Sequence, residues 1–137
     1  MNEHADITIQ DLDRSHFKAA ETLWAEGGFG SEPQLWERLQ TLITMNPGLS
    51  KVALDGEAVV GIALCSQNGF SGYVFRLVVN ETHRGQGIGG QLMSACEEAL
   101  SAMGIPKVFV NAEPPLHEWY ARLGFQKTDA SFLFKFL

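Results

Sequence analysis

The fold is decided by one stretch of the chain: Leu77-Val-Val-Asn-Glu-Thr-His-Arg-Gly-Gln-Gly-Ile-Gly-Gly-Gln-Leu92. An apolar run leads through a short loop into a helical pattern whose first turn holds Gly85, Gly87, Gly89 and Gly90. The first N–H groups of a helix have no intrahelical partner, they lie at the positive end of the helix dipole, and glycine has no Cβ to keep a ligand away. The turn is therefore predicted to bind an anion, with a pyrophosphate as the favoured ligand.

Two other interpretations of this turn deserve comparison. Glycines that serve only close helix–sheet packing would explain one or two of the four. Read as a dinucleotide-binding fingerprint, Gly85-x-Gly87-x-x-Gly90 has Glu113 at a suitable distance for a ribose contact. In that fold, however, the glycines follow the first strand directly, whereas here they follow several strand-like runs and Asn80 to Arg84 intervene. The pyrophosphate turn of another fold is favoured.

The residues before the turn predict a strand, two helices and an antiparallel meander. Ile7 and Ile9 alternate with polar residues as in an edge strand. Helical spacing follows from residue 17 to 24, and a second helix is expected from a Ser31/Gln34 capping box to Pro47-Gly48. Three strands are then predicted, joined by turns at Asp55-Gly56 and Asn68-Gly69; they are residues 52–54, 59–64 and 73–79.

The residues after the turn predict a crossover helix and a mixed sheet. Apolar residues recur at helical spacing from Ile88 to Met103, with Gly104 as the expected C-terminal glycine and a strand at 107–110. Because a long helix connects the strand before the turn to the strand at 107–110, these two strands are expected to pair in parallel in one sheet. A short helix at 116–123 and two last strands, 125–127 and 132–136, complete the prediction. The fold class is α/β: one domain, residues 6–137, with a mixed, mostly antiparallel central sheet flanked by helices.

Composition limits the classes of function. The chain has 137 residues, 45% hydrophobic and 19% charged, which is the size of a single globular domain. Cys65 and Cys96 lie in apolar runs without a second ligand nearby, so neither a disulfide scaffold nor a metal site is expected. The net charge is −6 and no basic cluster occurs, which argues against nucleic acid. Neither an apolar run of about 18 residues nor a signal peptide is present, so we expect a cytoplasmic protein without a membrane partner.

Two motifs resemble those of the GNAT superfamily of acetyl-CoA-dependent N-acetyltransferases. Arg84-Gly-Gln-Gly-Ile-Gly89 is similar to the family's Gln/Arg-x-x-Gly-x-Gly/Ala signature, and Leu77-Val-Val79 to the strand that precedes it. Trp119-Tyr-Ala-Arg-Leu-Gly-Phe125 resembles the second motif, aromatic-Tyr-x-x-x-Gly-Phe. The predicted order of elements also resembles the GNAT fold over nearly the whole chain.

The resemblance implies acetyl-CoA as the cosubstrate and assigns its binding residues. Main-chain N–H groups of the glycine turn would hold the pyrophosphate, the preceding strand would run beside the pantetheine arm, and the Val79 N–H would stabilise the developing oxyanion. The implied cofactor-binding residues are Leu77, Val78, Val79, Arg84, Gly85, Gln86, Gly87, Ile88, Gly89 and Gly90.

The resemblance also implies catalytic roles. Tyr120 corresponds to the general acid that protonates the departing thiolate, although by spacing alone it would be read as a core aromatic. The base is less explicit, because Asn111 occupies the position of the glutamate base of ribosomal-protein acetyltransferases. Glu113 is favoured if the preceding strand continues that far, with His117, Tyr73 or a water chain as alternatives.

Three further side chains have open interpretations. Arg76 interrupts an apolar strand and faces opposite to Leu77 and Val79; it either meets an anionic group of the acceptor or is solvated. His83 either helps with phosphate charge or is solvated. His117 is either catalytic or structural.

The expected activity is transfer of an acetyl group to a primary amine of a small molecule. The family's acceptor sites lie in variable loops, here 29–31 and 67–71. The alternatives are a non-catalytic acyl-CoA-binding module and a protein or peptide N-acetyltransferase, the latter weakened by Asn111. Either a monomer or a homodimer is compatible with the sequence.

Overall fold

A computed structural model describes residues 6–137; the five residues expected to precede the domain lie outside this range. One five-stranded sheet has the order β1-β2-β3-β4-β5, with four helices. The strands are β1 (Ile7–Asp11), β2 (Lys51–Asp55), β3 (Ala58–Gln67), β4 (Gly72–Val79) and β5 (Val108–Val110). The helices are α1 (Phe17–Glu26), α2 (Leu35–Met45), α3 (Ile88–Ala102) and α4 (His117–Arg122), with single 3₁₀ turns η1 (Arg14–His16), η2 (Glu81–His83) and η3 (Pro114–Leu116).

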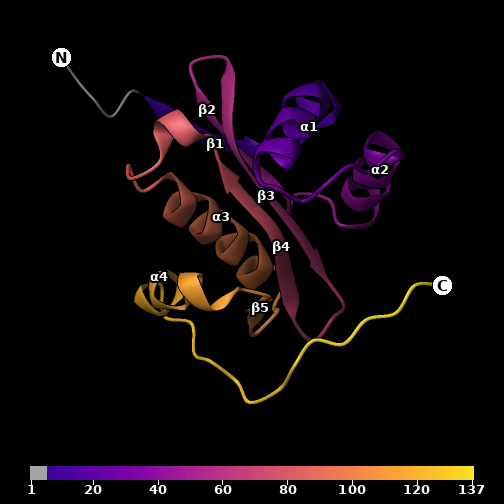
Figure 1. Ribbon diagram of the computed structural model, residues 1–137, viewed down its shortest axis with the longest axis vertical. Helices are drawn as coiled ribbons and strands as arrows, with labels where there is room; N and C mark the ends of the chain where they lie inside the picture. The colour runs from indigo at the N-terminus through magenta and orange to yellow at the C-terminus, as the bar shows by residue number, and fades with distance from the viewer. Residues whose placement is uncertain (1–5) are drawn as a thin grey trace.

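Helices cover both faces of the sheet. Figure 1 shows α1 and α2 on one side and α3 with α4 on the other. Alternation along the strands divides the buried residues into two cores. Ile62, Leu64 and Val78 face α1 and α2, whereas Ala63 and Val74 face α3. The expected α/β domain with a mixed, mostly antiparallel sheet is confirmed.

Local turn chemistry sets the antiparallel meander. Gly56 has φ of +63° in the two-residue turn between β2 and β3. In the turn between β3 and β4, the Asn68 Oδ1 accepts hydrogen bonds from the N–H groups of Phe70 and Ser71, and Gly69 has φ of +90°. Both turns lie where the sequence predicts them.

The parallel pair between β4 and β5 is short. The register joins Gly72 to Val108 and Val74 to Val110, and no further residues pair. Because β4 continues to Val79, its second half has no strand on the side of β5. A bulge at this point, where Leu64 pairs with Arg76 but Cys65 pairs with Val74, leaves Phe75 as the extra residue. The expected crossover through a helix is confirmed, and the end of β4 has no paired strand on the side of β5.

The expected strands at 125–127 and 132–136 are wrong. The structure has no strand after β5, and the Phe125 N–H instead donates to the Tyr120 carbonyl at the end of α4. The last residues form an extended segment that passes the start of β4 in Figure 1, where Phe132 stacks on Tyr73 with ring centroids 5.8 Å apart. Alternating apolar residues indicate which way side chains would face, but a strand also needs a hydrogen-bonded neighbour, and this segment has none.

The expected capping box before α2 is also wrong. Gln34 is the residue that caps α2, without a side-chain hydrogen bond, so the helix begins at Leu35. Glu32 provides the local contacts instead, since its Oε1 accepts from the Gln34 N–H at 3.5 Å and from the Arg38 Nε at 3.1 Å. No helix within residues 6–137 is long and apolar enough to cross a membrane.

Candidate functional site

The turn before α3 holds two glycines in the left-handed region. Gly85 has φ of +80° and Gly87 has φ of +81°. A Cβ built at either residue would meet no atom within 4 Å, so both face open space. An L-residue is strained at such φ values, and a side chain there would project into the space beside the helix end. Glycine at these two positions therefore serves the backbone angle and leaves the surface free for a ligand.

The N-terminus of α3 has no partner from its own chain. Gly87 caps the helix without a side-chain hydrogen bond, and the first intrahelical bond runs from the Gln91 N–H to the Gly87 carbonyl at 3.1 Å. Within residues 6–137, the N–H groups from Gly85 to Gly90 have no hydrogen-bond acceptor. A row of free N–H donors at the positive end of a 15-residue helix is the arrangement that binds a phosphate group. These residues fit the pyrophosphate of coenzyme A.

The other two glycines of the turn have a different role. A Cβ at Gly89 would come within 3.0 and 3.3 Å of two ring carbons of Trp119, and one at Gly90 would lie 3.8 Å from Leu123. Gly89 thus allows α4 to approach the first turn of α3. The packing interpretation accounts for this half of the turn, while Gly85 and Gly87 remain open. Side chains at Gly89 would be obstructed by Trp119 rather than by a ligand.

The end of β4 has one face of its main chain without a paired strand. The Asn80 N–H donates to the Val60 carbonyl at 2.7 Å, across to β3. Since N–H directions alternate along a strand, the Val79 N–H faces away from β3, on the side where β5 no longer pairs. The Val79 carbonyl accepts from the Arg84 Nε at 3.2 Å. One oriented donor therefore lies next to the α3 turn, and the Arg84 side chain supports this turn.

Tyr120 lies on α4, the helix that contacts the α3 turn. Its ring packs edge-on against Trp119 and Phe125, with ring centroids 4.8 and 5.5 Å away. Burial raises the pKa of Tyr120, because the phenolate would lose hydration. The phenol is therefore protonated at neutral pH, and its hydroxyl makes no hydrogen bond to any residue between 6 and 137. A neutral donor on the helix that contacts the α3 turn has the properties of a general acid.

His83 is not part of the anion site. Its Nε2 lies 3.0 Å from the Asp55 Oδ2, and its Nδ1 lies 2.9 Å from the Thr82 hydroxyl. These contacts tie η2 to the turn between β2 and β3. His83 is thus hydrogen-bonded to Asp55 and Thr82, and these contacts anchor the loop before the glycine turn.

The candidate bases have unequal support. β5 ends at Val110, so the condition that favours Glu113, a strand that continues to residue 113, is not met; Glu113 precedes η3 with an exposed side chain. His117 begins α4, three residues before Tyr120, so the two share a helix face. The His117 Nε2–H donates to the Ala112 carbonyl at 2.8 Å, which leaves Nδ1 as the free acceptor nitrogen. Tyr73 lies at the start of β4, stacked on Phe132.

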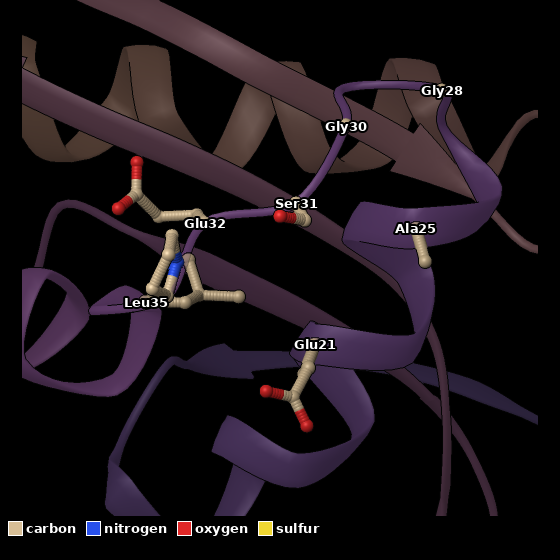
Figure 2. Close-up of a pocket in the computed structure, with 8 residues that line it drawn as sticks. Glu21, Ala25, Gly28, Gly30, Ser31, Glu32 and Leu35 are labelled. Carbon is tan, nitrogen blue, oxygen red and sulfur yellow. The ribbon is translucent and has the colours of Figure 1, made fainter.

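A cavity of about 590 Å³ lies at the loop between α1 and α2, away from the α3 turn. Figure 2 shows the carboxylates of Glu21 and Glu32 at this cavity, with Gly30 and Ser31 from the loop. The cavity includes two of the residues, 30 and 31, expected to contact an acceptor. Glu32 is already paired with Arg38.

Sequence reasoning missed two long-range contacts. Trp119 was read as part of a motif, but its contact with Gly89 is what positions α4 against the α3 turn. Asp55 was read only as a turn residue, yet it pairs with His83. Both contacts join residues about thirty apart in the chain, so spacing gives no signal for them.

Comparison with known proteins identifies the family. Residues 12–125 match the model of the Acetyltransferase (GNAT) family. The chain belongs to the GNAT family. It is also 30% identical over 87 residues to N-alpha-acetyltransferase 30 of Schizosaccharomyces pombe (strain 972 / ATCC 24843), and the match covers 58% of each chain. The chain thus spans a little over half the length of this curated relative.

Solved acetyltransferase structures share the fold. Aminoglycoside N-acetyltransferase AAC(6')-Iy in complex with CoA has a TM-score of 0.81 at 17% identity, covering 96% of this chain and 95% of that one. Glucosamine-6-phosphate N-acetyltransferase from Arabidopsis thaliana has a TM-score of 0.78 at 14% identity, covering 95% and 98%. Ard1 from Thermoplasma volcanium has a TM-score of 0.80 at 17% identity, covering 89% and 84%. At these identities the structures show that the chain shares their fold.

Proposed function

We propose that this GNAT protein transfers an acetyl group from acetyl-CoA to a primary amine of a small molecule. One observation carries the proposal: the free N–H groups from Gly85 to Gly90 lie beside the Val79 N–H and against the helix that bears Tyr120. An anion site, an oriented donor and a neutral acid are the parts that acyl transfer from a thioester needs. When bound, acetyl-CoA supplies an activated acyl carbon and a thiolate leaving group.

The α3 turn anchors the cosubstrate through its main chain. Charge-assisted hydrogen bonds contribute about 1.5–3 kcal/mol each, so several donors from Gly85, Gln86, Gly87, Ile88, Gly89 and Gly90 suffice for binding without a basic side chain. Leu77, Val78 and Val79 line the pantetheine arm along the unpaired part of β4. Anchoring at one end of β4 fixes where the reacting carbonyl lies.

Val79 and Tyr120 act on the reacting groups. The Val79 N–H donates a hydrogen bond to the carbonyl oxygen, and this bond strengthens as negative charge develops there. Tyr120 donates its proton to the departing sulfur. A phenol with an ordinary pKa of 10.0 is a fair match to an alkyl thiol, and burial raises the pKa of Tyr120, which keeps this donor protonated.

The amine must lose a proton before it attacks, because an alkylammonium has a pKa of about 10. Glu113 and His117 are the candidates for this step, and the shared helix face with Tyr120 supports His117 more than the exposed position supports Glu113. The pH dependence of kcat/KM is expected to show a basic limb near pH 6–8. A limb lost in His117→Gln but retained in Glu113→Gln assigns the role to His117, and the converse assigns it to Glu113. A limb unchanged in both variants excludes both residues.

Two measurements test the function itself. Coenzyme A should raise the melting temperature of the protein, since a ligand at 100 times its Kd stabilises by about 2.7 kcal/mol, whereas NAD should not. A panel of primary amines should then release free thiol from acetyl-CoA. Stabilisation by coenzyme A without thiol release from any amine would favour the non-catalytic binding module. Release only with peptides would assign a peptide acceptor.

A further inference from the structure

Arg76 lies in a cluster of aromatic rings that catalysis, as derived above, does not use. Its guanidinium carbon is 4.4 Å from the centroid of the Phe29 ring and 4.9 Å from that of the Trp24 ring. Its Nη1 donates to the Phe75 carbonyl at 2.7 Å. Residues from α1, from the loop after it and from β4 therefore hold the guanidinium in one place.

This guanidinium has no negative partner within the described chain. The protein has sixteen Asp and Glu residues, yet Arg76 makes none of the ion pairs found between residues 6 and 137. The Arg76 Nε and the neighbouring Trp24 Nε1 are both buried without an acceptor. Aromatic faces only partly offset the loss of hydration of a cation. A partly buried positive charge with unused donors is suited to an anion from outside the protein.

The position of Arg76 shows which anion can reach it. It lies past the last β4–β5 pair, Val74 with Val110, in the part of β4 that has no partner on the side of β5. It packs with α1, on the face of the sheet opposite to Leu77 and Val79, which face α3. The pyrophosphate site at the α3 turn is on the other face. Arg76 is three residues from Val79, about 10 Å along a strand, so a small molecule can span from one to the other.

We propose that Arg76 determines acceptor specificity by binding an oxyanion of the acceptor, either a carboxylate or a phosphate, while the amine of the same molecule reaches the thioester beside Val79. The acceptor is thus an amine that carries a negative group. This inference rests on the proposed acetyl transfer and narrows its substrate class. The planar guanidinium is held over two rings and its Nε has no acceptor within the described chain, which favours recognition of an oxyanion by a fork of donors.

The test compares matched acceptors in the wild type and in Arg76→Met. One pair is L-phenylalanine and L-phenylalaninamide, which differ in the carboxylate; the other is glucosamine 6-phosphate and glucosamine, which differ in the phosphate. The ratio of kcat/KM within a pair is measured by thiol release from acetyl-CoA. In one pair, the wild-type ratio should exceed that of Arg76→Met by about tenfold to a hundredfold, the effect of one or two charge-assisted hydrogen bonds. The pair whose kcat/KM ratio changes in Arg76→Met shows whether the bound group of the acceptor is a carboxylate or a phosphate.

Controls separate recognition from structure. Arg14 also lies over an aromatic ring, Phe17 at 6.0 Å, but on η1, so Arg14→Met should keep the wild-type ratio. A merely structural role for Arg76 would lower the rates for both members of a pair equally. Melting temperatures with coenzyme A plus each compound give a second readout that needs no turnover. There the anionic member should stabilise the wild type more than Arg76→Met.

Two results overturn the inference. One is a kcat/KM ratio that is the same in the wild type and in Arg76→Met for both acceptor pairs. The other is that the anionic member of neither pair is preferred over its neutral counterpart, in turnover or in melting temperature. If coenzyme A still stabilises the protein in these experiments, only the role of Arg76 is rejected. If coenzyme A alone gives no stabilisation, the acetyltransferase proposal itself fails.

Discussion

The two ends of α3 use glycine in the same conformation for opposite purposes. Gly87 at the N-terminus has φ of +81° and Gly104 beyond the C-terminus has φ of +80°. At the C-terminus the chain closes on itself: the Gly104 N–H donates to the Ser101 carbonyl at 2.9 Å and the Ile105 N–H to the Leu100 carbonyl at 3.0 Å. At the N-terminus, no residue between 6 and 137 accepts from the first N–H groups. A positive φ therefore does not mark a binding site, whereas an unclosed helix end does.

The largest expected effect concerns Tyr120, which lies on the helix packed against the open end. Tyr120→Phe should lower kcat by about tenfold to a thousandfold with little change in acetyl-CoA affinity, because it removes the acid and keeps the ring contacts with Trp119 and Phe125. Since burial raises the pKa of Tyr120 above 10.0, ionisation of this acid should not reduce wild-type kcat until the pH exceeds 10. Steady-state kinetics check both statements. Unchanged kcat in a stably folded Tyr120→Phe variant would show that Tyr120 has a structural role and is not the acid.

A matched pair of variants tests the two ends of α3 directly. Gly87→Ala and Gly104→Ala place the same methyl group at nearly the same φ, and each has open space around the new Cβ. Both should destabilise the fold by about 1–2 kcal/mol. Only Gly87→Ala should weaken coenzyme A binding, by about tenfold to a hundredfold, measured by calorimetry. Equal affinity for coenzyme A in the two variants would show that the N-terminal end of α3 is not the binding end.

Substitutions at Gly89 and Gly90, the two glycines that pack against α4, should change the stability of the fold. Gly89→Val introduces a side chain where a Cβ already lies 3.0 Å from the Trp119 ring, so overpacking should cost about 1–3 kcal/mol in thermal unfolding. Gly90→Ala is the milder control, because its Cβ would make an ordinary contact with Leu123 at 3.8 Å. An unchanged melting temperature in Gly89→Val would mean that α4 does not rest on this turn.

The smallest effect on coenzyme A affinity is expected for substitution of Arg84. Its side chain is exposed and its Nε is engaged by the Val79 carbonyl, so most of the affinity should come from main-chain donors. Arg84→Ala should weaken coenzyme A binding by less than about tenfold, since one exposed charge contributes little. A loss larger than that of Gly87→Ala would shift the anion site from the main chain to this side chain.

The sequence predicts the elements whose signals are local. The turns at Asp55-Gly56 and Asn68-Gly69 and the open end of α3 depend on residues a few positions apart, and they form where expected. The Ser31 capping box is also a local signal, yet Glu32 competes for the same N–H, so the pattern alone was insufficient.

Long-range partners could not be predicted. The alternating apolar residues at 132–136 specify which side chains would share a face, but they do not specify a neighbouring strand, and no strand forms there. The same limit applies to the Gly89–Trp119 contact and to the Arg76 cluster, which brings Trp24 and Phe29 onto β4 from about fifty residues away. Motif resemblance implies roles on the cofactor side, whereas on the acceptor side no motif decides between the two interpretations of Arg76, and its aromatic contacts are visible only in the structure.

The most direct test of the central claim is an amide NMR titration of ¹⁵N-labelled protein with coenzyme A. Main-chain binding of the pyrophosphate predicts the largest shifts at the N–H groups of Gly85, Gly87, Gly89 and Gly90, while Gly104 at the closed end of the same helix stays unchanged. Saturable binding that leaves the amides from Gly85 to Gly90 unshifted, or that moves both ends of α3 equally, would contradict the account.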